Sequence, residues 1–210
     1  MSLLEKINSR QTSTWIFLAV GAAFIAILIF NDLASNPSSY ELKIKQEREQ
    51  KNLQFTNDPE SPIKKEDRPG FQGLKYFPPN EDYLVPATFI PFPDPDTLLL
   101  LTSTGTDYEV IRAGKLAFTL QGQSLELTAF LYLEPGKDAY FVPFRDLTTN
   151  VSTYGGGRYM DIPAGDPLMI DFNKAYNPYC AYNASFVCPL PPKENKLNLE
   201  ILAGEIYLTK

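Results

Sequence analysis

The chain has 210 residues with a net charge of −6 and 44% hydrophobic residues, which leaves room for one domain of common size plus extensions. It contains no histidine, which excludes His-based acid–base catalysis, Ser-His-Asp and Cys-His nucleophiles, and every metal site that needs imidazole. Acidic and basic residues are interspersed, with no basic stripe between aromatics, so we expect no nucleic-acid partner. The 12 tyrosines, 14 phenylalanines and 18 prolines favour strands and ordered loops over helices.

The amino-terminal segment predicts a membrane anchor. No charged residue occurs from Gln11 to Asn31, and Trp15 to Phe30 is nearly all apolar. As a helix, this apolar core with its flanks approaches the roughly 30 Å of hydrocarbon that a span must cross. A buried core helix fits less well because it would need a polar face, and a cleaved signal peptide lacks a good small-x-small site. We therefore expect a cytoplasmic tail at 1–14 and a single transmembrane helix at 15–31, with the membrane as a partner.

The flanks of the predicted span indicate its orientation. Lys6 and Arg10 precede it, whereas Asn31 to Leu42 carries no lysine or arginine. This asymmetry places the amino terminus in the cytoplasm and the domain outside, although the basic residues from Lys43 onward dilute it.

Residues 32–56 predict a linker and a juxtamembrane helix. Ser38 and Glu41 have the spacing of a capping box, so we expect a charged helix from Tyr40 to about Leu53. Its apolar residues follow no clean 3.6-residue period, which predicts that much of it is solvated. A turn-rich connection at 57–70 then opens a domain that we expect to cover 57–210.

Short strand patterns dominate this domain. Alternating apolar residues flank Gln121–Ser124, which predicts a β-hairpin there. Further strands are expected at Leu74–Phe77, Tyr83–Phe89, Leu98–Leu101, Ala139–Phe144, Leu168–Phe172 and Leu197–Leu208. Seven to nine short strands with tight turns predict a mainly β fold, an antiparallel sandwich or a small barrel, with one long ordered Pro/Asn-rich loop.

Three consecutive glycines precede Arg158 and form what we call the glycine loop, residues 153–157. Such a run costs folding entropy, so it indicates unusual φ/ψ angles or a close backbone approach. In one interpretation it is a hairpin tip with Arg158 paired to Asp146 or Asp161. In the other, a nest of backbone N–H groups joins Arg158 in binding a carboxylate or phosphate. It is neither a P-loop nor a dinucleotide fingerprint.

A second unusual stretch is the Asn/Pro/Cys loop, residues 171–195. Its Asn and Asp residues stand beside Pro and aromatic residues, a composition that forms Asx-turns and fixes extended geometry. Long irregular loops ordered in this way are often functional. The loop is therefore either a structural knot or one wall of a binding site.

These motifs resemble domain-of-unknown-function family 1684. The similar motifs are YGGGRY at 154–159, DFNxAYNP at 171–178, two cysteines, CPLPPxEN at 188–195 and AGE at 203–205. The resemblance begins near residue 45 and runs to residue 210. The resemblance implies no activity, substrate or cofactor. It also implies that the predicted membrane anchor is an addition to the family domain.

Cys180 and Cys188 enclose a loop of about nine residues. In an oxidising compartment we expect a disulfide, worth about 2.5 kcal/mol in the loop-entropy model, and in the cytoplasm a reduced pair that packs as small apolar side chains. A metal site would have only carboxylates to complete its shell, so we expect none. A catalytic thiolate would need Lys174, Arg158 or a helix terminus to lower its pKa.

The leading functional hypothesis is a non-catalytic module, without a cofactor, that binds a small polar or anionic ligand or a partner protein at the two loops. The rival is an enzyme that works without histidine, through Asp161 or Asp171 paired with Glu194, or through Cys180 as nucleophile. A third is a structural envelope component. The candidate ligand-binding residues are Arg145, Asp146, Tyr154, Arg158, Asp161, Asp171, Asn173, Tyr176, Asn177, Glu194 and Asn195.

Overall fold

The computed structural model describes residues 21, 25, 37–133, 136 and 138–207. The predicted tail and span at 1–31 lie outside these residues, apart from Gly21 and Ile25, and no helix in the described part of the chain is long and apolar enough to cross a membrane. The chain divides into two compact units, 1–42 and 43–210. The helix that begins at Ser39 continues into the second unit, which also contains the described strands.

The regular elements are one helix, six strands and five single-turn 3-10 helices within the described residues. The helix and strands are α2 (Ser39–Asn57), β1 (Leu84–Leu101), β2 (Asp107–Leu120), β3 (Gln123–Leu131), β4 (Ala139–Phe144), β5 (Arg158–Pro163) and β6 (Met169–Asp171). The 3-10 helices are Arg68–Gly70, Glu81–Tyr83, Phe172–Lys174, Tyr179–Ala181 and Lys193–Asn195.

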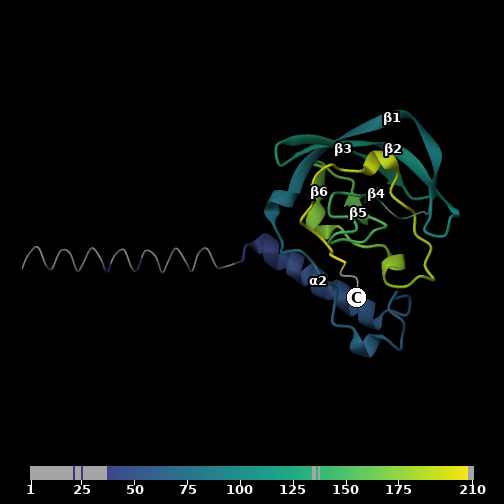
Figure 1. Ribbon diagram of the computed structural model, residues 1–210. Helices are drawn as coiled ribbons and strands as arrows, with labels where there is room; N and C mark the ends of the chain where they lie inside the picture. The colour runs from purple at the N-terminus through teal and green to yellow at the C-terminus, as the bar shows by residue number, and fades with distance from the viewer. Residues whose placement is uncertain (1–20, 22–24, 26–36, 134–135, 137, 208–210) are drawn as a thin grey trace, which may run out of the picture. The chain divides into compact units, whose positions relative to one another are not determined.

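The six strands form one antiparallel sheet in the order β5-β4-β3-β2-β1-β6. In Figure 1 the sheet curls round, with β1, β2 and β3 arching over β4, β5 and β6. Just after β6, the backbone of Tyr176 exchanges two hydrogen bonds of 2.8 and 2.9 Å with Tyr159 in β5. This contact brings the two edges of the sheet together. The fold is therefore a nearly closed barrel, which confirms the mainly β, antiparallel prediction.

The predicted hairpin between β2 and β3 is confirmed. Its two turn residues, Gln121 and Gly122, have φ angles of 52° and 76°. Two successive positive φ angles define a type I′ turn, whose twist matches that of the flanking strands.

Strand β1 joins two segments, Tyr83–Phe89 and Leu98–Leu101, that we expected to be separate strands. Its register with β2 shifts between Pro91 and Asp96, yet the pairing resumes and continues to Leu101. Proline has no N–H for the ladder, so the proline-rich centre interrupts the hydrogen bonds without ending the strand. This merger is one reason why the described residues contain six strands rather than the expected seven to nine.

Two other predicted strands were wrong. Leu74–Phe77 contributes a single bridge, between Tyr76 and Glu205. Leu197–Tyr207, the described part of the predicted last strand, forms no strand either. Its backbone bonds to short stretches of different segments, as Leu197 does to Arg145 and Ile206 to Lys75, and side chains bind backbone groups between them, so no continuous ladder forms. The N–H of Ile201, for example, donates to the Asp146 carboxylate at 2.9 Å.

The core consists of two clusters on opposite faces of the sheet, because successive side chains in a strand point to opposite sides. The inner cluster faces the inside of the barrel and includes Val142 of β4 and Met160 of β5. The outer cluster lies on the other face and includes their chain neighbours Phe141 and Tyr159. The Asn/Pro/Cys loop supplies Tyr176, Cys180, Phe186 and Cys188 to the outer cluster. The loop therefore covers the outer face of the sheet.

Helix α2 contacts the domain through a stripe of residues spaced three or four positions apart. Ile44 and Phe55 are buried at its two ends. Between them, Arg48 donates to the carbonyl of Phe77 at 2.9 Å, and Asn52 accepts from the N–H of Leu74 at 2.8 Å. The stripe is partly polar, which explains why it shows no apolar period, while most of the helix surface is exposed as we expected.

Candidate functional site

A cavity of about 510 Å³ lies between the outer face of the sheet and the Asn/Pro/Cys loop. Aromatic side chains form most of its wall: Tyr108, Tyr132, Phe141, Tyr159, Tyr176, Tyr179 and Phe186. The remaining lining residues are Lys51, Asp161, Pro178, Val187, Cys188 and Pro189. A largely apolar cavity of this size with a few polar groups has the character of a small-molecule site.

Asp161 is the one carboxylate among the described residues that line this cavity. Its two oxygens accept hydrogen bonds from the hydroxyl groups of Tyr132, at 2.6 Å, and Tyr176, at 2.7 Å. Burial, followed by the interaction with Asp161, raises the pKa of both tyrosines far above the ordinary value. Both hydroxyls therefore stay protonated and hold the carboxylate in one orientation.

Lys51 of α2 supplies the cation of the cavity wall. Its ammonium forms an ion pair of 2.7 Å with Glu205, whose side chain is completely buried, and lies 4.5 Å from the ring centre of Tyr176. Glu205 also accepts from the hydroxyl of Tyr182 at 2.6 Å and from the N–H of Asn177 at 2.8 Å. The charge of Lys51 is thus neutralised within the protein.

The two cysteines lie side by side at the edge of the cavity, and both are free thiols in the structure. The N–H of Cys180 donates to Sγ of Cys188 at 3.2 Å, and the hydroxyl of Tyr154 donates to Sγ of Cys180 at 3.9 Å. A hydrogen bond from the Cys188 thiol, aided by Tyr154, lowers the pKa of Cys180 to about 6. The same interaction raises the pKa of Cys188. The disulfide between them stays a prediction.

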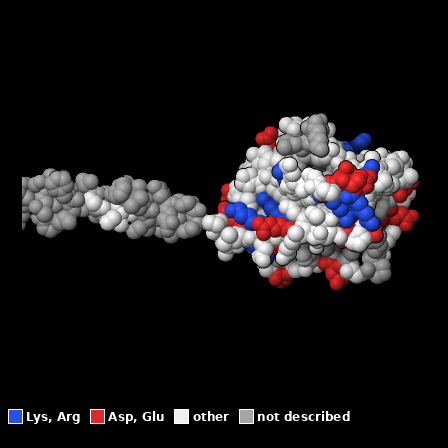
Figure 2. All heavy atoms as spheres, turned by 90° about the horizontal axis from the view of Figure 1, so that it is seen from below, with Lys and Arg blue, Asp and Glu red and all other residues white. Residues whose placement is uncertain are grey.

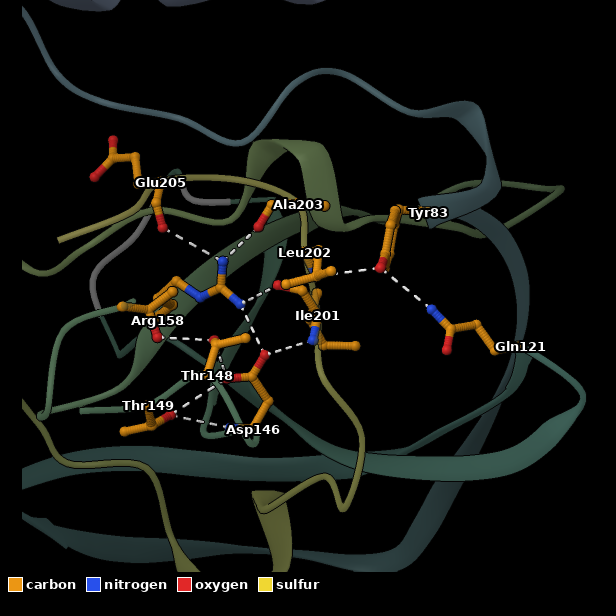
Figure 3. A network of polar contacts seen from close by, with 11 residues as sticks. Tyr83, Gln121, Asp146, Thr148, Thr149, Arg158, Ile201, Leu202, Ala203 and Glu205 are labelled. Carbon is orange, nitrogen blue, oxygen red and sulfur yellow. Dashed lines mark hydrogen bonds and ion pairs between the residues drawn. The ribbon is translucent and has the colours of Figure 1, made fainter. Parts of the chain in front are cut away.

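Arg158 does not reach the cavity. Its side chain is 1% exposed and forms an ion pair with Asp146 at 2.9 Å. Figure 3 shows the same guanidinium donating to backbone carbonyls, including that of Ile201 at 3.0 Å and that of Ala203. Asp146 in turn accepts from the hydroxyl of Thr148 at 2.7 Å. Of our two interpretations of the glycine loop, the structure shows the ion pair with Asp146.

The glycine loop itself serves packing. Gly157 has a φ of +89°, and a Cβ there would lie 2.6 Å from the carbonyl oxygen of Phe144 and 2.6 Å from Cγ of Pro191. A side chain at this position is excluded both by the backbone angle and by these contacts. With Arg158 buried beside it, the loop presents no arginine to a carboxylate or phosphate.

The three candidate asparagines are buried and hold loops in place. Asn195 bridges the N–H and carbonyl of Thr128 and the carbonyl of Pro143, with bonds of 2.7 to 2.8 Å. Asn173 bonds to both backbone groups of Asn80, at 2.9 and 2.7 Å. The amide of Asn177 donates to the carbonyl of Ile206 at 3.2 Å. These contacts are of the side-chain-to-backbone kind that orders irregular loops.

The remaining candidates lie outside the cavity lining. Asp171 accepts from the N–H of Asn173 at 3.0 Å, and Glu194 is exposed. Arg145 is half-buried, and its backbone N–H donates to the carbonyl of Asn195 at 2.9 Å. Asp161 and Tyr176 are thus the two candidates that the structure brings together in the cavity, while Tyr154 contacts Cys180 beside it.

Sequence reasoning missed most of the cavity. Lys51 comes from the helix that we expected to be solvated. Tyr108 and Phe141 come from the outer face of β2 and β4, and Tyr132 directly follows the end of β3. The available signal was the aromatic residues on that face, in positions where a solvated sheet face would carry polar residues. The side of the molecule seen in Figure 2 carries acidic and basic side chains in small mixed groups, without a continuous patch of one sign.

Fold and site together define a nearly closed β-barrel domain with an aromatic cavity on its outer face, and Asp161 is the carboxylate among the described residues of the cavity lining. The chain belongs to the family described as "Protein of unknown function (DUF1684)", whose model matches residues 69–206. It is also similar to the solution NMR structure of an uncharacterised protein from Haloarcula marismortui, with 39% identity and a TM-score of 0.64, over 80% of this chain and 94% of that one. No curated protein matches. The expected family is therefore confirmed, and neither its description nor that of the similar structure states a ligand or an activity.

Proposed function

We propose that this domain binds a small organic molecule in the cavity between the sheet and the Asn/Pro/Cys loop. The observation that carries the proposal is the Asp161 carboxylate, fixed by Tyr132 and Tyr176 within a wall of aromatic rings. A polar group held in one orientation among apolar surfaces is the usual arrangement for recognising a ligand. The Asn/Pro/Cys loop then acts as one wall of the site, held rigid by its buried asparagines.

We further propose that the apolar segment at 15–31 holds the domain at a membrane with the domain on the outer side. Its composition supports an anchor, and Lys6 and Arg10 before it support the orientation. The thiol state of the cysteines in intact cells tests this orientation, because an oxidising compartment favours a disulfide between Cys180 and Cys188. A reduced pair in cells that secrete other proteins with intact disulfides would contradict it.

Ligand binding is tested with the full chain in detergent, its tyrosine rings labelled with ¹³C, and a mixture of small organic fragments. We expect the ring signals of the cavity tyrosines to shift. The variant Val187→Trp should abolish the shifts, because Val187 lines the cavity and is 50% exposed, so a larger side chain can fill the space without disturbing the core. Val151→Trp is the matched control, since Val151 is 81% exposed and lies elsewhere. Shifts that survive Val187→Trp would contradict the proposal.

A thiol-dependent enzyme is the second candidate, favoured by the pKa of about 6 for Cys180. In such a reaction the Cys180 thiolate would attack an activated ester, the alcohol would leave, and water would hydrolyse the thioester. Release of nitrophenol from nitrophenyl acetate, lost in Cys180→Ser, tests this. An enzyme that uses a pair of carboxylates has less support, because Asp171 and Glu194 do not line the cavity beside Asp161.

A further inference from the structure

We infer that the ligand of this cavity is an organic cation, a small molecule that carries a substituted ammonium group. The inference rests on the proposed function and gives it a chemical class. It is carried by the position of the Asp161 carboxylate within a wall of seven aromatic side chains, with no ion pair to any lysine or arginine among the described residues.

The charge balance of the cavity favours a cation. Lys51, the one lysine or arginine among the described residues of the lining, is bonded to the buried Glu205 at 2.7 Å. Its positive charge is therefore already matched. The charge of Asp161 is left over, because neutral tyrosine hydroxyls are its hydrogen-bond partners. An anionic ligand would be repelled by Asp161, and the arginine that we expected to attract it, Arg158, is 1% exposed.

The aromatic wall has the same preference. The faces of aromatic rings are electrostatically negative and attract ammonium groups within about 6 Å of the ring centre. The cavity already contains one example, since the ammonium of Lys51 lies 4.5 Å from the ring centre of Tyr176. Cages of aromatic side chains are the usual means by which proteins bind quaternary and methylated ammonium groups.

The tyrosine hydroxyls prepare the carboxylate for such a ligand. Tyr132 and Tyr176 each donate to a different oxygen of Asp161. A carboxylate has about four lone-pair positions, so each oxygen keeps one for a further N–H donor or for a close electrostatic contact. Both hydroxyls are occupied in holding Asp161, which makes them poor donors to a competing carboxylate ligand.

The test compares three probes of nearly identical shape by isothermal titration of the full chain. Choline carries the positive charge, 3,3-dimethylbutan-1-ol replaces its nitrogen by carbon, and 3,3-dimethylbutanoate carries a negative charge. The detergent must have a sugar headgroup, because a choline-headed detergent would compete with the probe. We expect choline to bind about 10-fold more tightly than the neutral alcohol, and the anion not to bind.

Variants at Asp161 separate the carboxylate from the aromatic wall. Asp161→Asn should weaken choline binding about 10-fold and leave binding of the neutral alcohol unchanged, while Asp161→Glu should restore part of the preference. The exposed Asp82, changed to Asn, is the control for altered net charge. Thermal unfolding of each variant checks that the fold is intact.

The outcomes distinguish the inference from the proposed function. If the alcohol or the anion binds as tightly as choline, or if Asp161→Asn leaves the preference for choline intact, the cation inference fails while small-molecule binding stands. If none of the three probes binds but fragments still shift the cavity tyrosines in a Val187-dependent manner, the inference alone fails. If neither experiment detects binding, both fail.

Discussion

Removing the negative charge of Asp146 should destabilise the domain by about 3 kcal/mol, because it leaves Arg158 as an unpaired buried cation. Both side chains of this ion pair are 1% exposed, and their charged atoms lie 2.9 Å apart. Asp146→Asn preserves the shape of the side chain. Its new NH₂ group can face the hydroxyls of Thr148 and Thr149, which rotate to accept, so the remaining oxygen still accepts from Arg158 and Ile201.

Because those hydrogen bonds survive, the cost lies at the lower end of the roughly 3 to 5 kcal/mol that breaking a buried ion pair costs. That is a large share of a typical domain stability of about 5–15 kcal/mol. Urea unfolding followed by near-UV circular dichroism of the buried tyrosines measures it. Tryptophan fluorescence is unsuitable, since the one tryptophan of the chain, Trp15, lies in the predicted anchor.

Asp96→Asn is the matched control. Asp96 also pairs with an arginine at 2.9 Å, but that pair, with Arg112, has side chains that are 51% and 38% exposed. Exposed ion pairs contribute between about 0 and 1 kcal/mol, so this variant should lose little stability. Equal losses in Asp146→Asn and Asp96→Asn would refute the reasoning that burial, rather than distance, sets the cost.

Three further effects are expected. The alkylation rate of Cys180 in the reduced protein should rise with pH around a midpoint of about 6, because the lowered pKa makes the thiolate dominant above that pH. Tyr154→Phe should move this midpoint upward, and a rise confined to the region above about pH 8 would contradict the prediction. Gly157→Ala should cost at least about 1 kcal/mol more than Gly122→Ala in urea unfolding, since both have positive φ but only Gly157 is crowded by neighbouring atoms; equal costs would remove the packing argument. Asn195→Ala should lower the unfolding free energy by about 3 kcal/mol, because three buried backbone groups lose their partner, and a loss below about 1 kcal/mol would mean that water replaces it.

The sheet was predictable where local pattern and turn chemistry agree. The β2–β3 hairpin follows from alternation on both sides of Gln121–Gly122, and the family follows from its motifs. The prediction failed at Leu197–Tyr207, where the backbone bonds to several segments in turn and side chains bind the groups between them. No local pattern reveals that an arginine at position 158 will bind those carbonyls, because the residues meet only in the folded domain.

The site was predictable in part for the same reason. The concentration of unusual residues located the Asn/Pro/Cys loop and included Asp161 and Tyr176. Most of the other candidates are unusual because they order the backbone, and a buried asparagine such as Asn195 has the same sequence signature as a ligand-binding one. Lys51 could not be found from periodicity, since the contact stripe of α2 contains charged residues that pair with the domain.

The partners of Arg158 have a consequence for biosynthesis. The arginine lies at the start of β5, but carbonyls that stabilise it belong to Ile201, Ala203 and Glu205, more than forty residues later in the chain. A chain that emerges from the ribosome in order can form β1 to β5 before these residues exist. Until they arrive, the guanidinium lacks its backbone acceptors and would be costly to bury. The barrel therefore reaches its final packing only after residue 205 has been translated, and a nascent chain stalled before that point is expected to remain a substrate for chaperones and proteases.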